Sequence, residues 1–265
     1  MKKVAILVIA AVNQPVYISY IRNYWTSVIN LTRSIDHIDV FLLLENSMPR
    51  REFQYLSENV IIDPRSDFDE LLPEEFQKPR SGLPSILSKT IHALEMLKDD
   101  YDLFFRTNLS SLIKISAFDR FVQSKDEFIY SGAWVWADCL RDNLLHHNNV
   151  GPGKSIADLS ELDAFEGNTF VSGAGYFINA AEALSLVERK DHIRYDLADD
   201  VSVGLMFSRH ELLHGFSDIA WPEQPAQEVA NMIRDSRACH IRLQHFSPLL
   251  AENVWMLIKD DSAWQ

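Results

Sequence analysis

Cysteine is scarce in this chain of 265 residues, which holds only Cys139 and Cys239. Neither belongs to a CxxC pair, so the sequence offers no disulfide framework and no cysteine zinc site. Two isolated thiols fit a reducing compartment, and we expect a cytoplasmic protein.

Long apolar runs are also missing. Lys2 and Lys3 precede the nine apolar residues VAILVIAAV, far fewer than the roughly 20 of a membrane span. The basic start resembles that of a signal peptide, but Asn13, Gln14 and Pro15 follow without a clear small-residue cleavage site. We therefore expect a first buried strand and no transmembrane segment.

Positive charge is in deficit, because the formal net charge is -13 at pH 7. An acidic chain is poorly suited to a nucleic-acid backbone or an anionic membrane as its main partner, although a local basic pocket could still hold a nucleotide. The hydrophobic fraction of 47% is that of an ordinary globular protein, so we expect one compact unit over 1–265.

The apolar pattern alternates between strand and helix. Strands are predicted over 4–10, 38–44 and 60–62, and helices over 15–31 and 52–56. Such alternation predicts an α/β fold with a mostly parallel central sheet flanked by helices.

The later elements follow the same pattern. After a proline-rich surface excursion, the predicted elements are a helix over 83–97, a strand over 103–105, a helix over 115–122 and a strand over 127–130. The irregular stretch 132–168 is either a binding loop or a surface insertion.

Polar side chains gather directly after the predicted strand 103–105. They are Arg106, Thr107, Asn108, Ser110 and Ser111. Ligands bind at the carboxyl ends of strands in open α/β sheets, so this cluster is a candidate ligand site. The alternative is that residues 108–111 cap the following helix.

A second informative segment, Thr169 to Asn179, reads TFVSGAGYFIN. Gly173 and Gly175 permit close approach of another backbone or of a ligand, and Tyr176 adds aromatic surface. A bulged strand packed in the core is the alternative. The segment lacks the third glycine of a dinucleotide fingerprint.

A third segment, Leu197 to Gly204, carries adjacent Asp199 and Asp200 at the start of a helical pattern. A helix N-terminus favours one negative charge, and one carboxylate would suffice as a cap. Two neighbouring carboxylates can instead supply a general base and its partner, because like charges at close range raise one pKa.

Taken in order, these three segments resemble the donor-side core of nucleotide-sugar glycosyltransferases with the GT-A fold. The nearest pattern is that of the β-1,3-galactosyltransferase and fringe-type enzymes, in which a DxD-type motif, an SGGGY-like segment and EDV or DDV with a later glycine follow one another. Here SGAGY at 172–176 and DDVSVG at 199–204 are similar to the second and third elements. The resemblance covers 101–204. It implies a single GT-A-like domain, with a nucleotide-donor half in 1–111 and an acceptor and catalytic half in 112–265.

The resemblance implies an inverting hexosyl or pentosyl transfer from a nucleotide-diphosphate donor, expected to be a UDP-sugar, to a hydroxyl of a glycan or lipid-linked acceptor. Asp200 would be the general base, and Asp199 would bind the acceptor or tune Asp200. The donor-binding candidates are Ala10, Val12, Asn13, Lys89, Arg106, Thr107, Asn108 and Ser110. The acceptor-binding candidates are Trp134, Trp136, Gly173, Gly175 and Tyr176. A solvated helix lysine is the alternative for Lys89.

The sequence departs from the family at the DxD motif, where it reads RTNLSS over 106–111. Hard divalent cations prefer carboxylate oxygens, so an Asn and Ser site should hold Mn²⁺ or Mg²⁺ weakly. His240 and His245 are further metal-ligand candidates, expected to follow a late strand. Alternatively Arg106 neutralises the diphosphate and makes the enzyme independent of metal.

Two other functions stay open. A catalytically silent carbohydrate- or nucleotide-binding protein would explain the missing DxD motif. A nucleotidyltransferase shares the early α/β pattern, but it usually has a glycine-rich loop after the first strand, and residues 10–15 contain no glycine.

Overall fold

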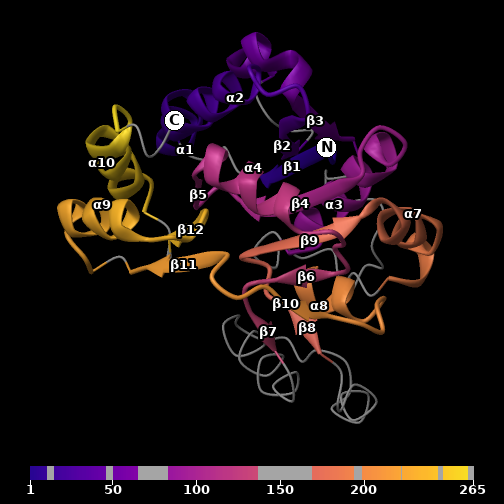
Figure 1. The fold of residues 1–265 in the computed structure, drawn as a ribbon. Coiled ribbons are helices and arrows are strands. Elements are labelled where there is room, and N and C mark those ends of the chain that lie inside the picture. The colour runs from indigo at the N-terminus through magenta and orange to yellow at the C-terminus, as the bar shows by residue number, and fades with distance from the viewer. Residues whose placement is uncertain are drawn as a thin grey trace, which may run out of the picture.

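A computed structural model describes residues 1–10, 15–45, 50–64, 83–136, 169–193, 199–221, 223–243 and 247–261. Its main feature is a seven-stranded sheet in the order β10-β6-β9-β4-β1-β2-β3 (Figure 1). Four of the strand pairs in this sheet are parallel and two are antiparallel. The predicted α/β fold with a mostly parallel central sheet is therefore confirmed.

The parallel part of the sheet comes from the first half of the chain. Its strands are β1 (Val4–Ile9), β2 (Ile38–Glu45), β3 (Val60–Asp63) and β4 (Leu103–Asn108). Every residue of β1 is buried, as expected for a Val- and Ile-rich strand that is covered on both faces. The carboxyl ends of β1 and β4 lie side by side, with Ile9 opposite Asn108.

The antiparallel part comes from the second half. Its strands are β6 (Ser131–Gly132), β9 (Gly175–Asn179) and β10 (Glu211–Leu212). Because β9 runs antiparallel to β4, with Thr107 opposite Gly175, the start of β9 lies at the carboxyl end of β4. Residues from both sequence halves thus meet at one edge of the sheet.

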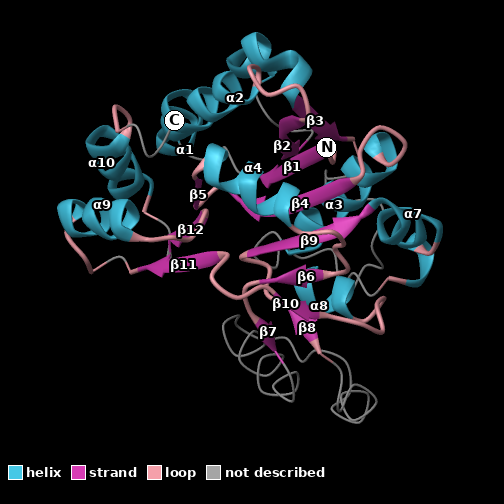
Figure 2. Cartoon of the chain, in the orientation of Figure 1, coloured by secondary structure: helices cyan, strands magenta, loops and turns pink. Residues whose placement is uncertain are grey.

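Two smaller sheets complete the strand arrangement (Figure 2). The order β11-β12-β5 joins Ser217–Ala220, His240–Leu243 and Ser111–Ile113, and β7 (Val135–Trp136) pairs with β8 (Phe170–Val171). β5 follows β4 directly and pairs antiparallel with β12. This pairing brings the C-terminal part of the chain to the end of β4.

Helices cover both faces of the central sheet. One face packs against a continuous helical stretch, with a π-helical turn in its middle, and against α4; these elements are α1 (Pro15–Tyr20), η1 (Ile21–Trp25), α2 (Thr26–Thr32) and α4 (Ile115–Ser124). The other face carries α3 (Leu83–Leu97), α7 (Ala180–Glu188) and α8 (Asp199–Gly204). The remaining helices are η2 (Arg50–Asn59), η5 (Lys190–His192), α9 (Ala226–Asp235) and α10 (Pro248–Ile258).

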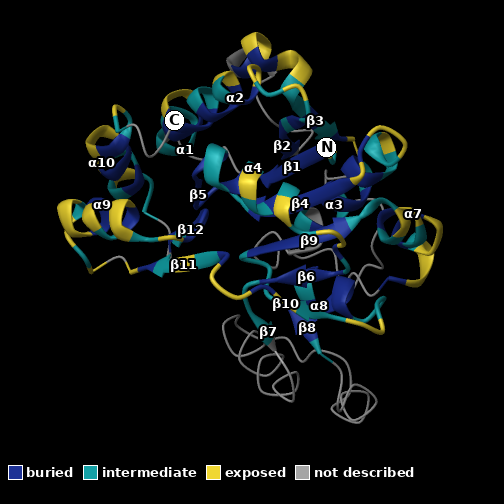
Figure 3. Cartoon of the chain, in the orientation of Figure 1, coloured by how far each residue is buried: buried dark blue, intermediate teal, exposed yellow. Residues whose placement is uncertain are grey.

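The buried residues form two hydrophobic clusters, one on each face of the sheet. Figure 3 shows that the central strands β1, β4 and β9 are mostly buried. Alternation along β4 divides its side chains between them: Leu103 and Phe105 belong to the first cluster and Phe104 to the second. The same alternation continues into the polar end of β4, so that Arg106 and Thr107 point to opposite faces.

Most predicted elements of the first half are confirmed, and the helix over 83–97 has the predicted bounds. The strand predicted over 127–130 was wrong by a few residues, because the chain enters the sheet only at Ser131. The helix-cap interpretation of 108–111 was also wrong: Ser111 begins β5, and α4 starts later, after Lys114, whose side chain forms no cap. Most of 132–168 lies outside the described residues.

No helix within the described ranges combines the length and the apolar character needed to cross a membrane.

Candidate functional site

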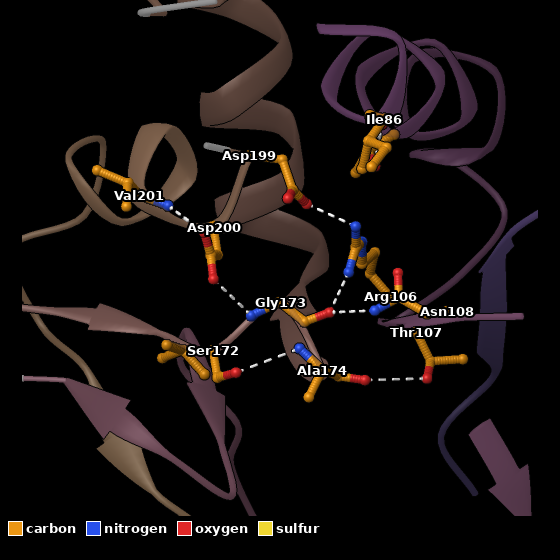
Figure 4. A network of polar contacts seen from close by, with 12 residues as sticks. Ile86, Arg106, Thr107, Asn108, Ser172, Gly173, Ala174, Asp199, Asp200 and Val201 are labelled. Carbon is orange, nitrogen blue, oxygen red and sulfur yellow. Dashed lines mark hydrogen bonds and ion pairs between the residues drawn. The ribbon is translucent and has the colours of Figure 1, made fainter. Parts of the chain in front are cut away.

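The three polar segments singled out in the sequence meet at one place (Figure 4). The end of β4 supplies Arg106 and Asn108, and the turn between β8 and β9 supplies Gly173. The start of α8 supplies Asp199 and Asp200. The Gly173 carbonyl accepts hydrogen bonds from Arg106 Nη1 and from Asn108 Nδ2, the latter at 2.8 Å. Residues separated by more than 60 positions are therefore held together by a single peptide group.

Arg106 forms a buried ion pair across this site. Its Nη2 donates to Asp199 Oδ2 at 2.6 Å, and only 2% of the residue is exposed. Its guanidinium carbon also lies 5.5 Å from the centre of the Tyr176 ring. Both terminal nitrogens of Arg106 are engaged by protein groups in this arrangement, and the diphosphate role expected of Arg106 stays a prediction.

Asp200 is the more accessible of the two carboxylates, since it is partly exposed whereas Asp199 is 7% exposed. Asp200 Oδ2 accepts a hydrogen bond from the Gly173 amide at 2.9 Å, and Oδ1 accepts one from the Val201 amide at 3.0 Å. A Cβ added at Gly173 would lie 3.2 Å from Asp200 Oδ2. The missing side chain at Gly173 is what lets the turn approach this carboxylate.

Burial dominates the electrostatics of both carboxylates. It raises the pKa of Asp199 to about 6, even though the Arg106 guanidinium acts in the opposite direction. It also raises the pKa of Asp200, against the hydrogen bond from Gly173 and the charge of Arg106. Two carboxyl groups with elevated pKa values beside one cation form the arrangement expected of an acid–base site.

The packing around Gly204 explains why the DDVSVG segment ends in a glycine. A Cβ added there would lie 3.0 Å from Phe170 Cα and 3.3 Å from the Thr169 carbonyl oxygen. The last turn of α8 therefore packs directly on β8, which fixes the helix that carries Asp199 and Asp200.

Thr107 points to the other face of β4 and joins a network of neutral groups. Its Oγ1 lies 3.1 Å from His240 Nε2, 2.8 Å from Ser111 Oγ and 3.2 Å from the Ala174 carbonyl oxygen. Ser217 Oγ lies 2.6 Å from the other ring nitrogen of His240. In a consistent assignment Ser217 donates to Nδ1, Nε2–H donates to Thr107, and Thr107 donates to Ala174.

His240 is fully buried and is the first residue of β12. The prediction that it follows a late strand was therefore wrong. Burial and the charge of Arg242 lower the pKa of His240 to about 3, so the ring is neutral. Both of its nitrogens contact hydroxyl groups. His245, the other histidine proposed as a metal ligand, lies outside the described residues.

Arg242 also lies at this edge, and the sequence reasoning missed it. Its Nη1 donates to Ser110 Oγ, and it is partly buried on β12. The available signal was a charged residue within the short apolar strand HIRL.

Lys89 is buried, contrary to the interpretation of a solvated helix lysine. It is 2% exposed, and its Nζ donates to the Ala10 carbonyl oxygen at 3.2 Å, so it approaches the carboxyl end of β1. Ala10 is fully buried. Val12 and Asn13, the other candidates after β1, lie outside the described residues.

The acceptor candidates differ in exposure. Tyr176 is fully buried, and a Cβ at Gly175 would lie 2.9 Å from the Phe105 ring, so both belong to the packed interior. Trp134 is partly exposed and its carbonyl accepts from the Ser172 amide at 2.8 Å, beside the Gly173 turn. Trp136 lies in β7 opposite Phe170, and its side chain is outside the described part.

The residues at the DxD position do not fit a divalent cation. They present a buried guanidinium, a threonine hydroxyl within the His240 network, and an Asn108 amide that donates to Gly173. Hard cations prefer carboxylate oxygens, and a cation would meet the positive charge of Arg106 here. Within the described ranges, no group of three or more His, Cys, Asp or Glu side chains is arranged to hold a metal.

Comparison with known proteins gave structural similarities only. No protein-family model and no curated protein sequence matches the chain. The solved structures that align with it include three glycosyltransferases. One is a glycosyltransferase involved in the glycosylation of the major capsid of PBCV-1 (8% identity, TM-score 0.48), covering 96% of this chain and 98% of that one.

The second is the galactosyltransferase LgtC in complex with donor and acceptor sugar analogs (14% identity, TM-score 0.44), covering 96% of this chain and 94% of that one. The third is mouse xyloside xylosyltransferase 1 (12% identity, TM-score 0.46), covering 92% and 98%. With TM-scores below 0.5, these similarities assign no activity, and the basis for a function is the site itself.

Proposed function

We propose that the protein is an inverting glycosyltransferase that moves a sugar from a nucleotide-diphosphate donor, with UDP-sugars first among the candidates, to a hydroxyl group of a glycan or lipid-linked acceptor. The observation that carries this proposal is the Asp200 carboxylate, which is partly exposed and fixed by the Gly173 amide at the carboxyl edge of the sheet. The sequence resemblance of the same three segments supports it independently.

Asp200 is the general base in this proposal. Its carboxylate takes the proton from the acceptor hydroxyl as that oxygen attacks the anomeric carbon of the donor sugar. The bond between the anomeric carbon and the phosphate oxygen breaks, and the nucleoside diphosphate leaves with the bonding electrons. A base with an elevated pKa accepts a proton more readily near neutral pH than an ordinary carboxylate.

Asp199 and Arg106 have a supporting role. Because Arg106 holds Asp199 at 2.6 Å and also bonds the Gly173 carbonyl, the pair fixes the turn whose amide positions Asp200. Asp199 is therefore a positioning residue rather than an acceptor ligand. The partly exposed Trp134, whose carbonyl accepts from the Ser172 amide beside the same turn, stays a candidate to contact a sugar acceptor.

The substitution Asp200→Asn tests the proposal. An asparagine oxygen can still accept from the Gly173 amide, so the fold and donor binding should be retained. Turnover should fall at least about a hundredfold, the usual contribution of a general base. Asp191→Asn serves as the matched control, because Asp191 is an exposed aspartate in the first turn of η5.

The measurement is release of nucleoside diphosphate and formation of product from a panel of nucleotide sugars, with EDTA and separately with Mn²⁺. Equal turnover by Asp200→Asn and the wild type would remove Asp200 from the mechanism. Absence of turnover with every donor, while nucleotide still binds, would instead favour a catalytically silent carbohydrate- or nucleotide-binding protein.

A further inference from the structure

Arg242 lies at the end of β4 although it is remote in sequence. It is opposite Ser111 in the pairing of β12 with β5, and the Leu243 amide donates to the Ser110 carbonyl at 3.0 Å. Its own Nη1 donates to Ser110 Oγ. The guanidinium is therefore held against the polar turn that follows β4, at the carboxyl edge of the central sheet.

The charge of Arg242 is not compensated by the protein in the way that the charge of Arg106 is. Among the described residues no carboxylate lies within ion-pair distance of Arg242, whereas Asp199 is engaged by Arg106. Burial and repulsion from Arg106 lower the pKa of Arg242 to about 10, although the charge of Asp199 acts in the opposite direction. A largely buried cation without a paired anion costs free energy, which an anionic ligand would offset.

Arg242 also keeps a route to a ligand. It is the one partly exposed residue of β12, whose other three residues are buried. Ser110 accepts from one terminal nitrogen, so the other guanidinium donors have no hydrogen-bond partner among the described groups. A planar guanidinium with donors to spare matches the oxygens of a phosphate or diphosphate.

We propose that Arg242, with Ser110, binds the diphosphate of the donor and supplies the positive charge that a divalent cation would supply at a DxD motif. This inference rests on the proposed function and assigns to Arg242 the role that the sequence suggested for Arg106. Arg106 remains with Asp199 and the Gly173 turn.

Calorimetric titration with UDP, in EDTA, tests this assignment. Arg242→Gln should weaken UDP binding at least about tenfold, the loss expected for one charge-assisted hydrogen-bonding group. Binding of uridine, which has no phosphate, should be unchanged. Arg237→Gln is the matched control, because Arg237 is an exposed arginine just before β12 and should leave UDP affinity as in the wild type.

Thermal unfolding without ligand separates a binding role from a structural one. If Arg242 is an uncompensated cation, the melting temperature of Arg242→Gln should equal or exceed that of the wild type, while the increase caused by UDP shrinks. A lower ligand-free melting temperature together with unchanged UDP affinity would overturn the proposal. If Arg242→Gln does not fold, Arg242→Lys decides: weakened UDP binding supports the proposal, and full affinity contradicts it.

Failure of this inference can be told from failure of the proposed function. Loss of turnover in Asp200→Asn together with normal UDP affinity in Arg242→Gln would support the transferase proposal and exclude Arg242 from the donor site. Loss of UDP affinity in Arg242→Gln, with no donor turned over by the wild type, would leave the diphosphate site standing and remove the transferase. A wild type that binds no UDP would overturn the inference.

Discussion

The two networks that meet at the end of β4 differ in charge and in how completely their polar atoms are paired. Arg106, Asp199 and Asp200 form a charged network on one face of the strand (Figure 4). Thr107, His240 and Ser217 form a neutral network on the other face. In the charged network Arg106 Nε and the nearby Tyr176 hydroxyl are buried without a hydrogen-bond partner in the described part of the chain. Both ring nitrogens of His240 are paired.

This difference in pairing distinguishes a catalytic network from a structural one. Buried polar groups are normally satisfied, and incomplete pairing of a charged cluster is a cost that a fold retains where chemistry requires it. The neutral network joins β4, β12, β11 and the Gly173 turn through uncharged groups that need no ligand. We therefore interpret the charged network, which contains the proposed base Asp200, as the catalytic part of the site. The neutral network is the set of contacts that keeps it in position.

The largest expected effect comes from breaking the charged network. Arg106→Gln leaves the buried Asp199 carboxylate without its cation and should lower the free energy of unfolding by about 3–5 kcal/mol. Urea unfolding measures this change. The control is Lys190→Gln, which removes an ion pair with Glu95 of similar length, 2.7 Å, but at the surface, so a loss of about 0–1 kcal/mol is expected. Equal losses would mean that burial does not make the Arg106–Asp199 ion pair contribute more to stability than a surface ion pair does.

The next effect concerns the packing that carries the charged network. Gly204→Ala places a methyl group against the backbone of Phe170 and should destabilise the protein by about 1–3 kcal/mol through overpacking. It should also lower turnover, because α8 moves with Asp200. Gly215→Ala is the comparison, since Gly215 has φ +70 and open space around it, so alanine there is strained without touching the site. Turnover that falls equally in both variants would argue against a specific role for α8.

The two networks should respond to pH in opposite directions. His240 has a depressed pKa of about 3, so as pH falls below its ordinary value near 6.5 the unfolded chain takes up a proton that the folded protein refuses. Its contribution to stability is complete above that value and declines by up to about 1.4 kcal/mol per pH unit during acidification. Asp199 has a raised pKa of about 6, so its contribution is complete below its ordinary value and is lost as pH rises through 6.

Unfolding curves between pH 4 and pH 7 test this contrast. His240→Gln should flatten the acid side of the stability profile, and Asp199→Asn should flatten the loss between pH 4 and pH 6. His214→Gln, at an exposed position, controls for removal of a histidine. If the profiles of both site variants run parallel to that of the wild type, burial of His240 and of Asp199 does not determine how stability depends on pH.

The sequence predicted much of the first half of the fold and little of the second. β1, β2, β3 and α3 are long or strongly apolar, so local periodicity identifies them. By contrast β6, β8 and β10 have only two residues each and exist because partners from distant parts of the chain pair with them. Such short strands carry no periodic signal.

The sequence identified most residues of the candidate site but not which of them contact one another. The polar end of β4, the Gly173 turn and Asp199–Asp200 were recognised from the residues, and the structure brings them together. That Arg106 faces Asp199 while Thr107 faces His240 depends on the pairing of β4 with β9 and on the second sheet. Arg242 was missed for the same reason, because only the pairing of β12 with β5 carries it to Ser110.

The smallest effect, and the finest test of the comparison, is expected for Thr107→Val. Valine has nearly the shape of threonine, so packing is kept while the hydroxyl between His240 and Ala174 is lost; the expected cost is about 1 kcal/mol, the net value of a buried hydrogen bond. Thr90→Val is the matched control, because that buried hydroxyl bonds within its own helix, to the Ile86 carbonyl at 2.9 Å. If the neutral network keeps the charged network in position, Thr107→Val should lower turnover several-fold at unchanged UDP affinity, and Thr90→Val should not. Equal turnover in the two variants, measured with saturating donor at one temperature, would mean that His240 and Ser217 stabilise the fold without aligning the Gly173 turn.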